Sequence, residues 1–399
     1  MISTYLNKYQ KYLIIILWVA VSISLTLYSF TQVDLGLTLT QLPVWQDIQK
    51  SFQHIGYYDR ELSVQIYIGI LIGFFVLYGY TLYLTKKKKI SRSLLLIIIL
   101  LVTSILTLSY NAFSYDIFNY IFWLKTITLY HQNPYIMTAL DFPADPMNYH
   151  MRWRESTYPY GPVWLILYVP ITLLAFNKFL ITFYLIKSTT AVFFLLSLFI
   201  IEKIAKKTKV IDPLFAVAFF ALNPLVLIES LVSAHNDIIM MFFVLVALYF
   251  IISGKYFHSV IFYIISVLTK FATIFALPIY FYRFFKKRDD LYFNFIILCT
   301  IPAVILASLR TNYQPWYLMY IFPFISFRSN KNYFLIPSII FSFGGLLIYS
   351  AYIALGDLNS LGLLIIQVIN YTTFIGVGIF LLIYLTVLLI KRRRKKRKF

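Results

Sequence analysis

The sequence predicts an all-α, polytopic transmembrane protein with about 11–13 membrane segments, some of them half-length. Of its 399 residues, 61% are apolar and only 13% are charged. Soluble domains average about 45–50% apolar and about 25% charged residues. The mean hydropathy is +0.79, and long apolar runs recur along the whole chain between short polar segments. These observations exclude a soluble globular enzyme and a disordered or fibrous chain.

The distribution of basic residues predicts the topology. The formal net charge is +20, and most of the 35 lysine and arginine residues stand in five places. These are Lys8 with Lys11, residues 86–92, residues 203–209, residues 283–288 and the tail 391–398. Cytoplasmic loops of membrane proteins are enriched in lysine and arginine. We therefore expect a multi-pass protein of the cell membrane with cytoplasmic termini and no nucleic-acid partner.

Crossings counted from a cytoplasmic N-terminus give each apolar run a direction. Residues 12–30 form the first span, and no small-residue cleavage site follows at 31–34, so we expect this helix to be retained. An outer loop at 31–62 follows, then spans at 63–84 and 93–110 and a second outer loop at 111–160. Later spans are expected at 179–202, 213–231, 238–252, 292–309, 317–327 and 333–355, before a last run that ends at 390. We expect residues 1–399 to form a single membrane domain.

Two runs do not fit a simple alternation of crossings. Only one crossing fits between the loop at 111–160 and the basic run at 203–209, so the shorter candidate, residues 161–176, is predicted to be partial or re-entrant. Residues 256–285 have both ends on the basic side and Lys270 near the middle. Two half-length helices that meet near the outer face would explain that pattern.

The segment 114–135 carries the first candidate site. Asp116, Asn119 and Tyr120 are spaced i, i+3 and i+4, so on a helix they share one face. A carboxylate at the membrane surface can accept the proton of an alcohol that attacks a substrate. Alternatively, Ser114 or Asp116 caps an interfacial helix by binding its open amides.

The second candidate, residues 151–162, has Arg152 and Arg154 on either side of Trp153. Arginine binds phosphate in a forked geometry, which suits a phosphorylated substrate. Lipid headgroup binding or anchoring in the aromatic belt would explain the same residues.

The third and fourth candidates lie deeper in apolar sequence. His235, Asn236 and Asp237 stand between two apolar runs, where polar groups are costly. They are candidates for sugar binding, or alternatively Asn236 or Asp237 caps the helix that follows. Lys270 is isolated within an apolar run, so either it meets a phosphate near the outer surface or its long stem snorkels to the interface.

A last boundary segment, residues 309–317, combines Arg310 with Trp316 and Tyr317. Their rings suit sugars and prenyl chains equally. Nucleotide-binding and zinc-hydrolase motifs are missing from the sequence, and the single cysteine, Cys299, excludes a disulfide framework. The candidate segments together combine carboxylates, cations and aromatic rings next to lipid, as a substrate with a sugar, a phosphate and a hydrocarbon tail requires.

These segments resemble, in order, the motifs of the GT-C superfamily of integral-membrane glycosyltransferases. The similarity is greatest to bacterial polyprenyl-phosphomannose-dependent α-mannosyltransferases. The motifs are D-x-x-x-Y with NPY (116–120 and 133–135), WR with YPYGP (153–154 and 158–162), NP with HND (223–224 and 235–237), Lys270 before Pro278, and QPWY (314–317). In many relatives the aspartate follows the first span, which makes Asp34 the alternative to Asp116.

The resemblance implies a GT-C-like fold that transfers a hexose, with mannose favoured, from a polyprenyl-phosphate donor to a glycan or glycolipid acceptor. The transfer would invert the anomeric carbon at the outer face of the membrane. Asp116 would be the catalytic base, because a phosphate leaving group needs no general acid. The candidates for binding the donor phosphate are Arg152, Arg154, Lys270 and Arg310. The candidates for binding the sugar or acceptor are Tyr120, Asn133, Trp153, Tyr160, His235, Asn236, Asp237, Trp316 and Tyr317.

The resemblance implies no cofactor beyond the lipid-linked donor, and the sequence gives no support for a divalent cation. Asp116, His235 and Asp237 could bind a metal only if the fold brought them together. The expected partners are the polyprenyl-phosphate sugar, the acceptor and membrane lipids, and the sequence does not indicate an oligomeric state. A flippase or transporter of a lipid-linked saccharide is the alternative function.

Overall fold

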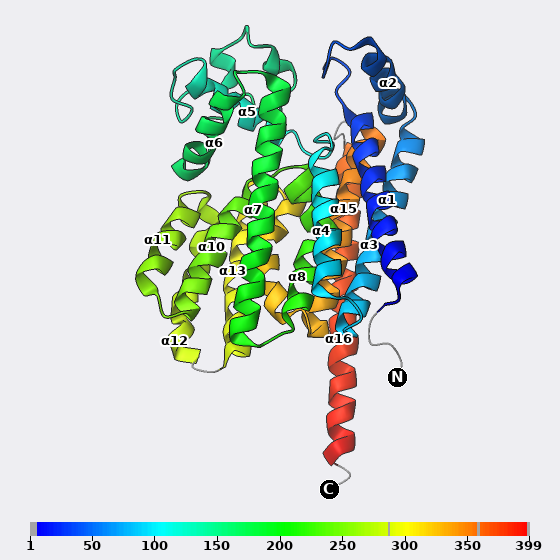
Figure 1. The fold of residues 1–399 in the computed structure, drawn as a ribbon, viewed down its shortest axis with the longest axis vertical. Coiled ribbons are helices and arrows are strands. Elements are labelled where there is room, and N and C mark those ends of the chain that lie inside the picture. The colour runs from blue at the N-terminus through cyan, green and yellow to red at the C-terminus, as the bar shows by residue number, and fades with distance from the viewer. Residues whose placement is uncertain (1–5, 286–287, 357–359, 397–399) are drawn as a thin grey trace.

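The computed structural model describes residues 6–285, 288–356 and 360–396. The chain is 79% helical, and no strand occurs in these ranges, so the predicted all-α class is confirmed (Figure 1). Three predicted segments include residues outside the described ones: the tail at 391–398 (residues 397–398), the basic run at 283–288 (residues 286–287) and the loop after residue 355 (residues 357–359).

Within the described residues, six helices are long and apolar enough to cross a hydrocarbon core of about 30 Å. They are α1 (Lys8–Ser29), α3 (Arg60–Lys86), α7 (Phe179–Thr208), α13 (Asp289–Thr311), α15 (Asn332–Leu355) and α16 (Ser360–Lys396). Five shorter apolar helices accompany them: α4 (Arg92–Thr107), α6 (Pro162–Leu174), α10 (Asp237–Ile252), α11 (Tyr256–Val267) and the 3-10 helix η6 (Phe271–Phe281). With one bent pair, described next, they account for the predicted mixture of full and half-length segments.

The bent pair comprises α8 (Pro213–Ala221) and the helix Pro224–Val232, which meet at 59°. The second part is α9 (Pro224–Leu227) followed by the π-helix η5 (Ile228–Val232). Asn223 lies at the break, where its side-chain oxygen accepts hydrogen bonds from the amides of Leu225 and Val226 at 3.0 and 3.4 Å. This cap and the proline after it explain why a new helix begins there.

The irregular segments that the sequence indicated are present. Residues 256–285 form α11, η6 and the short α12 (Tyr282–Phe285), with Lys270 at the break between α11 and η6. The segment 161–176 is the short α6, whereas the next run is the 30-residue α7. The expected return at 317–327 consists of three short helices, η7 (Pro315–Tyr320), α14 (Phe322–Ile325) and η8 (Ser326–Arg328). These are buried in protein, where irregular backbone at membrane depth is tolerated.

Shorter elements fill the two predicted outer loops. The first contains η1 (Phe30–Gln32), α2 (Pro43–Gln53) and the π-helix η2 (His54–Tyr58). The second contains α5 (Asp116–Thr128) and the 3-10 turns η3 (Ala139–Asp141) and η4 (Pro146–Tyr149). The second loop is tied back onto α5, because Asp145 accepts hydrogen bonds from Lys125 at 2.5 Å and Tyr130 at 2.7 Å.

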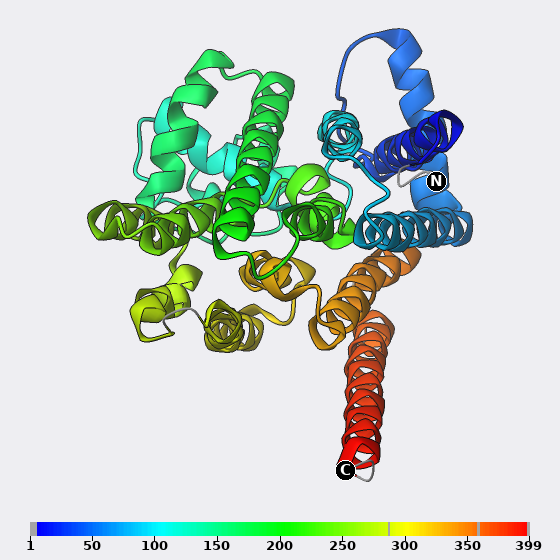
Figure 2. The ribbon, with the colours of Figure 1, turned by 60° about the horizontal axis from the view of Figure 1, so that its bottom comes forward.

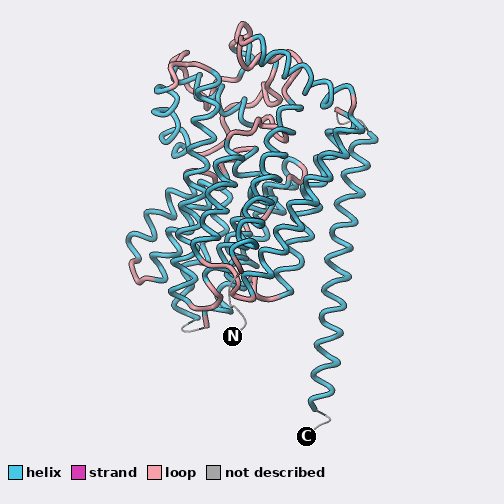
Figure 3. The backbone as a smooth tube through the Cα atoms, turned by 45° about the vertical axis from the view of Figure 1, so that its right-hand side comes forward, coloured by secondary structure: helices cyan, strands magenta, loops and turns pink. Residues whose placement is uncertain are grey.

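The helices form two groups side by side. One group packs α1 against α3 and α4, and α3 against α15; the other packs α10 between α7 and α11 (Figure 2). Both outer loops, with α2, α5 and α6, gather at one end, as Figures 1 and 3 show. The start of α1, α12 and the end of α16 lie at the opposite end (Figure 1).

Contacts between separate basic runs support this division. Near the N-terminus, the Leu6 amide donates a hydrogen bond to the Lys89 carbonyl at 3.3 Å. Arg92 at the start of α4 and Lys206 near the end of α7 both pair with Glu202, at 2.8 and 2.6 Å. The lysine- and arginine-rich segments therefore share the end of the molecule away from the outer loops.

The contact between α15 and α16 depends on the absence of a side chain at Gly344. A Cβ atom placed there would lie 2.0 Å from Oγ1 of Thr373 on α16, whereas one at Gly376 would meet nothing closer than 3.9 Å. We expect Gly344→Ala to push α16 away and to lower the unfolding free energy by about 1–3 kcal/mol, the usual cost of overpacking. Thermal denaturation in detergent measures this, with Gly376→Ala as the matched control. Equal melting temperatures for the two variants would contradict the close packing.

Candidate active site

Asp116 lies where two cavities meet. It is the first residue of α5, and its side chain is 14% exposed. One cavity, here the Lys270 cavity, has a volume of about 340 Å³, and the other, here the Arg60 cavity, about 160 Å³. Both are lined by Asp116, Trp153, Gln314 and Trp316. The carboxylate can therefore contact molecules bound on either side of it.

The side chain of Asp116 is held by polar contacts and does not cap its own helix. Its Oδ1 accepts a hydrogen bond from Nε1 of Trp153 at 3.3 Å. Asn119, one turn along α5, donates to the carbonyl of the same tryptophan at 3.1 Å. Tyr115 is the N-cap and makes no side-chain cap, while the Asp116 amide donates to Ser114 Oγ at 3.2 Å. The capping alternative therefore applies to Ser114 and leaves the carboxylate available.

His235 connects Asp116 to a second carboxylate in the interior. Its Nδ1 lies 2.9 Å from Oε2 of Glu229, and its Nε2 lies 3.0 Å from Ser114 Oγ and 3.7 Å from Asp116 Oδ2. The ring of Trp316 covers it, with ring centroids 4.3 Å apart. His235 and Glu229 are buried at 1% and 0% exposure. Glu229 also accepts a hydrogen bond from Tyr349 at 2.8 Å, so the chain of polar contacts runs from α15 to the site.

Burial of His235 acts against its positive charge, but its neighbours outweigh this effect. Burial alone lowers the pKa of His235, whereas the hydrogen bond to Glu229 and the charges of Glu229, Asp116 and Asp237 raise it. The net result is a pKa above the ordinary value. The histidine thus stays positively charged to a higher pH than a free imidazole does.

Lys270 stands in the break between α11 and η6 and faces the site. Its Nζ donates to Asp237 Oδ1 at 2.7 Å and to Asn236 Oδ1 at 3.3 Å. The rings of Tyr160 and Tyr320 lie 5.0 and 5.7 Å from the ammonium. Neither Asn236 nor Asp237 caps α10 through its side chain, so the capping alternative does not explain them. They pair with the lysine instead. Its ammonium group is surrounded by the amide oxygen of Asn236, a carboxylate oxygen of Asp237 and the two aromatic rings.

The backbone around Lys270 is clamped to the start of α6. The amides of Gly161 and Val163 donate to the carbonyls of Thr269 and Leu268 at 3.3 and 3.1 Å. A Cβ atom at Gly161 would lie 2.0 Å from the Leu268 carbonyl oxygen, so the close approach requires glycine. The YPYGP segment therefore positions Lys270.

A buried lysine on α7 joins the two segments that lead into the site. Lys187 is 0% exposed, and its Nζ donates to Ser109 Oγ at 3.0 Å and to the Val232 carbonyl at 2.8 Å. Ser109 precedes the segment that bears Asp116, and Val232 precedes the one that bears His235. This single side chain therefore links the Ser109 side chain and the Val232 backbone, which lead into the two sides of the Asp116–His235 contact.

Two of the four predicted cationic residues and several predicted aromatic residues line the Lys270 cavity. Its lining includes Lys270, Arg310, Tyr160, Trp316 and Tyr317. Trp123 lines it too, and its buried indole N–H has no hydrogen-bond partner in the part of the chain that the structure describes. A buried donor without a partner is costly, and a polar group bound in the cavity would satisfy it.

The other predicted residues lie around this centre. Tyr120 is buried at 1% exposure and packs on Tyr160, with ring centroids 6.2 Å apart. Arg152 lines the Arg60 cavity and stacks over Tyr115, whereas Arg154 is exposed and lines neither cavity. Asn133 is also exposed, and its side chain caps the turn at Tyr135. The roles predicted for all of these residues, including Arg154 and Asn133, stay predictions.

Asp34, the alternative base, is separate from both cavities. It accepts hydrogen bonds from Tyr115 at 2.9 Å and Tyr110 at 3.3 Å. Burial raises its pKa, although these bonds and the charges of His150 and Arg152 oppose the effect. Asp34 thus holds the hydroxyl group of Tyr115, the neighbour of Asp116, and lines neither cavity. The choice between Asp34 and Asp116 as the base stays a prediction.

The fold brings Asp116 and His235 together, as a metal site would have required. No cluster of three or more histidine, cysteine, aspartate or glutamate side chains with a metal-binding arrangement occurs in the described ranges.

Glu229 is a residue of the site to which the sequence analysis assigned no role. Its carboxylate contacts Nδ1 of His235 directly. A lone carboxylate within an apolar run was the signal, because such a group is costly without a partner.

Residues 22–285 match the family described as alpha-(1->6)-mannopyranosyltransferase, N-terminal domain. The chain belongs to this family. The matched region includes Asp116, Glu229, His235 and Lys270 and ends before Arg310 and Trp316. No curated protein and no solved structure matched the chain. The resemblance to GT-C mannosyltransferases is thus confirmed, and the family indicates an α-mannosyltransferase embedded in the membrane.

The raised pKa of His235 predicts a pH-dependent contribution to stability. A group whose pKa is higher in the folded state stabilises the fold fully below its unfolded value, about 6.5, and loses that effect as the pH rises through the folded value. Each unit of the increase corresponds to about 1.4 kcal/mol. We expect His235→Gln to lower the melting temperature most below about pH 6.5 and progressively less above it.

Differential scanning fluorimetry of the purified protein across pH measures this difference. His54→Gln is the control, since His54 is exposed and lines neither cavity. A melting-temperature difference for His235→Gln that stays constant with pH, or grows as the pH rises, would contradict the raised pKa.

Proposed function

We propose that this mannosyltransferase takes mannose from a polyprenyl-phosphate donor and transfers it, with inversion, to a hydroxyl group of a glycan or glycolipid. The observation that carries the proposal is the position of Asp116 on the wall shared by two cavities, one of which contains Lys270 and Arg310. A base between a cationic pocket and a second pocket suits a direct transfer between two substrates.

The Lys270 cavity suits the donor. Arg310 and Lys270 supply positive charge for the phosphate, and aromatic side chains surround the space for the sugar. The cavity borders apolar surface: Phe271, which lines it, is 54% exposed, and Leu309, next to Arg310, is 78% exposed. A prenyl chain could leave the cavity along this surface into the surrounding lipid.

The reaction is a single displacement at the anomeric carbon. The acceptor oxygen forms a bond to C1 as the bond from C1 to the phosphate oxygen breaks, and the phosphate leaves with the electron pair. Asp116 takes the proton of the acceptor hydroxyl. Arg310 and Lys270 stabilise the charge that develops on the phosphate. Since one displacement inverts C1, an α-linked product requires a β-linked donor.

His235 and Glu229 act as positioning residues for the base. The charged imidazole lies 3.7 Å from Asp116, and Glu229 orients it from the opposite side. The His235 ring also contacts Ser114 Oγ, which accepts a hydrogen bond from the first amide of α5. Together these contacts keep the carboxylate directed at the junction of the two cavities.

The distribution of charge supports a reaction at the outer face. The basic ends of the helices gather opposite the loops that bear Asp116 (Figure 1). Lysine and arginine near span ends favour the cytoplasmic side. With cytoplasmic termini, the site would open on the other side, where lipid-linked sugars replace nucleotide sugars as donors.

Membranes that contain the protein, incubated with a radiolabelled polyprenyl-phosphate mannose, test the proposed reaction. We expect label to move covalently to the acceptor and polyprenyl phosphate to be released. Movement of the labelled lipid between leaflets without transfer would instead support the flippase alternative and contradict the proposal.

Substitution of Asp116 tests most directly whether it is the catalytic base. We expect Asp116→Asn to lower kcat by about 10²–10⁴-fold, because general-base catalysis contributes about that much. Asp34→Asn is the matched control, since Asp34 has its own hydrogen bonds and lines neither cavity. Initial rates of mannose transfer measure both. Near-normal transfer by Asp116→Asn together with loss in Asp34→Asn would show that Asp34 is the base.

Arg310 is expected to act mainly on the donor. We expect Arg310→Gln to raise the KM for the donor by about 10–100-fold, because hydrogen bonds to charged groups contribute about 1.5–3 kcal/mol. Arg310→Lys should restore part of this loss, while the KM for the acceptor stays constant in both variants. Lys270→Ala should raise the donor KM as well. An unchanged donor KM in either Arg310→Gln or Lys270→Ala would remove that residue from the phosphate site.

A further inference from the structure

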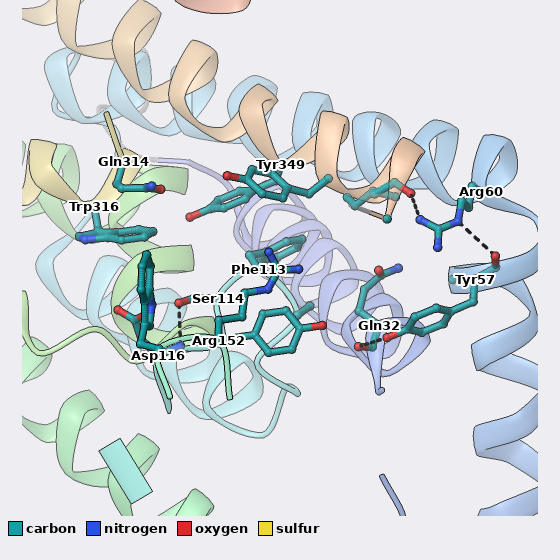
Figure 4. Close-up of a pocket in the computed structure, with 17 residues that line it drawn as sticks. Gln32, Tyr57, Arg60, Phe113, Ser114, Asp116, Arg152, Gln314, Trp316 and Tyr349 are labelled. Carbon is teal, nitrogen blue, oxygen red and sulfur yellow. Dashed lines mark hydrogen bonds between the residues drawn. The ribbon is translucent and has the colours of Figure 1, made fainter. Parts of the chain in front are cut away.

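The Arg60 cavity has a composition that the transfer of a neutral sugar does not require. Figure 4 shows its lining, with Asp116 and Trp316 toward one end and Arg60 at the other. Arg152 lines the space between these ends. Asp116 is the only carboxylate among the described residues that line this cavity.

Neither arginine forms a direct ion pair with an acidic side chain among the described residues, although the charge of Arg152 acts on the nearby Asp34. The ion pairs found in the described ranges include no contact of Arg60 or Arg152 with a carboxylate. Arg152 stacks on the ring of Tyr115 at 4.7 Å, an arrangement that orients the guanidinium and leaves its charge in place. Lys270 in the other cavity differs, because Asp237 pairs with it.

Arg60 is held by backbone carbonyls at the end of the cavity. It donates to the carbonyls of Tyr57 and Ile353 at 3.2 and 3.3 Å. These two bonds fix the side chain at the C-terminal end of α15, where a positive charge is favourable. A guanidinium has five N–H donors, so donors remain available for a ligand. The preorganised fork geometry is the one that binds phosphate and carboxylate groups in pairs of hydrogen bonds.

The rest of the lining suits a carbohydrate. Gln314 offers an amide group and Gln32 an amide oxygen, because Nε2 of Gln32 already donates to Tyr28, Thr31 and Ser63. The rings of Phe113 and Tyr349 stack on each other, with centroids 5.2 Å apart, and their remaining surface lines the cavity. Amide groups can hydrogen-bond sugar hydroxyls, and ring faces can stack on sugar rings. The cavity thus combines a polar and aromatic section next to the base with a cationic section farther away.

We propose that the Arg60 cavity is the acceptor site and selects an acceptor with an anionic group, such as a phosphodiester or phosphate, near the sugar to be extended. This inference rests on the proposed function, since it takes Asp116 to activate the acceptor hydroxyl. Arg60 and Arg152 bind the anion, and the sugar between them and Asp116 presents its hydroxyl to the carboxylate. The two cavities then use separate cations: Arg310 with Lys270 for the donor, and Arg60 with Arg152 for the acceptor.

Two acceptor probes that differ only in charge test this inference. They are mannosyl-glycerol phosphate and mannosyl-glycerol, each added with labelled polyprenyl-phosphate mannose to wild-type protein, to Arg60→Gln/Arg152→Gln and to Lys50→Gln. We expect the wild type to show a KM for the phosphorylated probe at least about tenfold below that for the neutral one. The double variant should lose this preference and keep its donor KM. Lys50→Gln, on the exposed face of α2, should behave as the wild type.

Equal KM values for the two probes in the wild type, or a preference that survives in the double variant, would overturn the inference while the transferase function stands. If neither probe is mannosylated, a thermal-shift assay still measures the binding of each probe to the purified protein. Charge-dependent stabilisation that requires Arg60 and Arg152 would then support the anion site and contradict the proposed transfer. Stabilisation that requires Arg310 instead would place the probe in the Lys270 cavity and overturn the inference.

Discussion

The contact of His235 with Glu229 and Asp116 is the interaction on which the site depends. The histidine lies in a break between helices and is buried in the protein, where charges need partners. Its two ring nitrogens face carboxylates from different parts of the chain, so it holds the start of α5 against the η5–α10 segment. Without such a bridge, Glu229 would be an uncompensated charge in the interior, and Asp116 would lose the group that fixes its direction.

Interrupted helices make this arrangement possible in a membrane. A continuous span would carry its side chains through hydrocarbon, whereas the breaks after Ala221, Val232 and Val267 turn polar residues inward. Each break is supported locally: by the Asn223 cap, by Lys187 on the Val232 carbonyl, and by Gly161 against Leu268. The long helices form the frame, and the short elements carry the chemistry.

Placing a carboxylate between two cavities also explains how one residue can serve two substrates. In the proposed reaction the donor occupies the Lys270 cavity, which borders exposed apolar surface, and the acceptor occupies the Arg60 cavity, whose lining comes from α3, α15 and the outer loops. Substrates that approach from different directions can then meet at Asp116. The two cavities also differ in charge pairing. Lys270 forms an ion pair with Asp237, whereas Arg60 and Arg152 form no ion pair with a described residue.

The sequence by itself determined the all-α membrane class, the break at Lys270, the partial helix before α7 and the segments that form the centre. These follow from hydropathy and charge, which depend on neighbouring residues and need no knowledge of contacts. The role of Glu229, the pairing of Lys270 with Asp237, and the assignment of Arg152 to a different cavity from Arg310 required the tertiary structure. Each depends on residues that are far apart in the chain, and a one-dimensional pattern does not specify which helices pack together or which way a break turns its side chains.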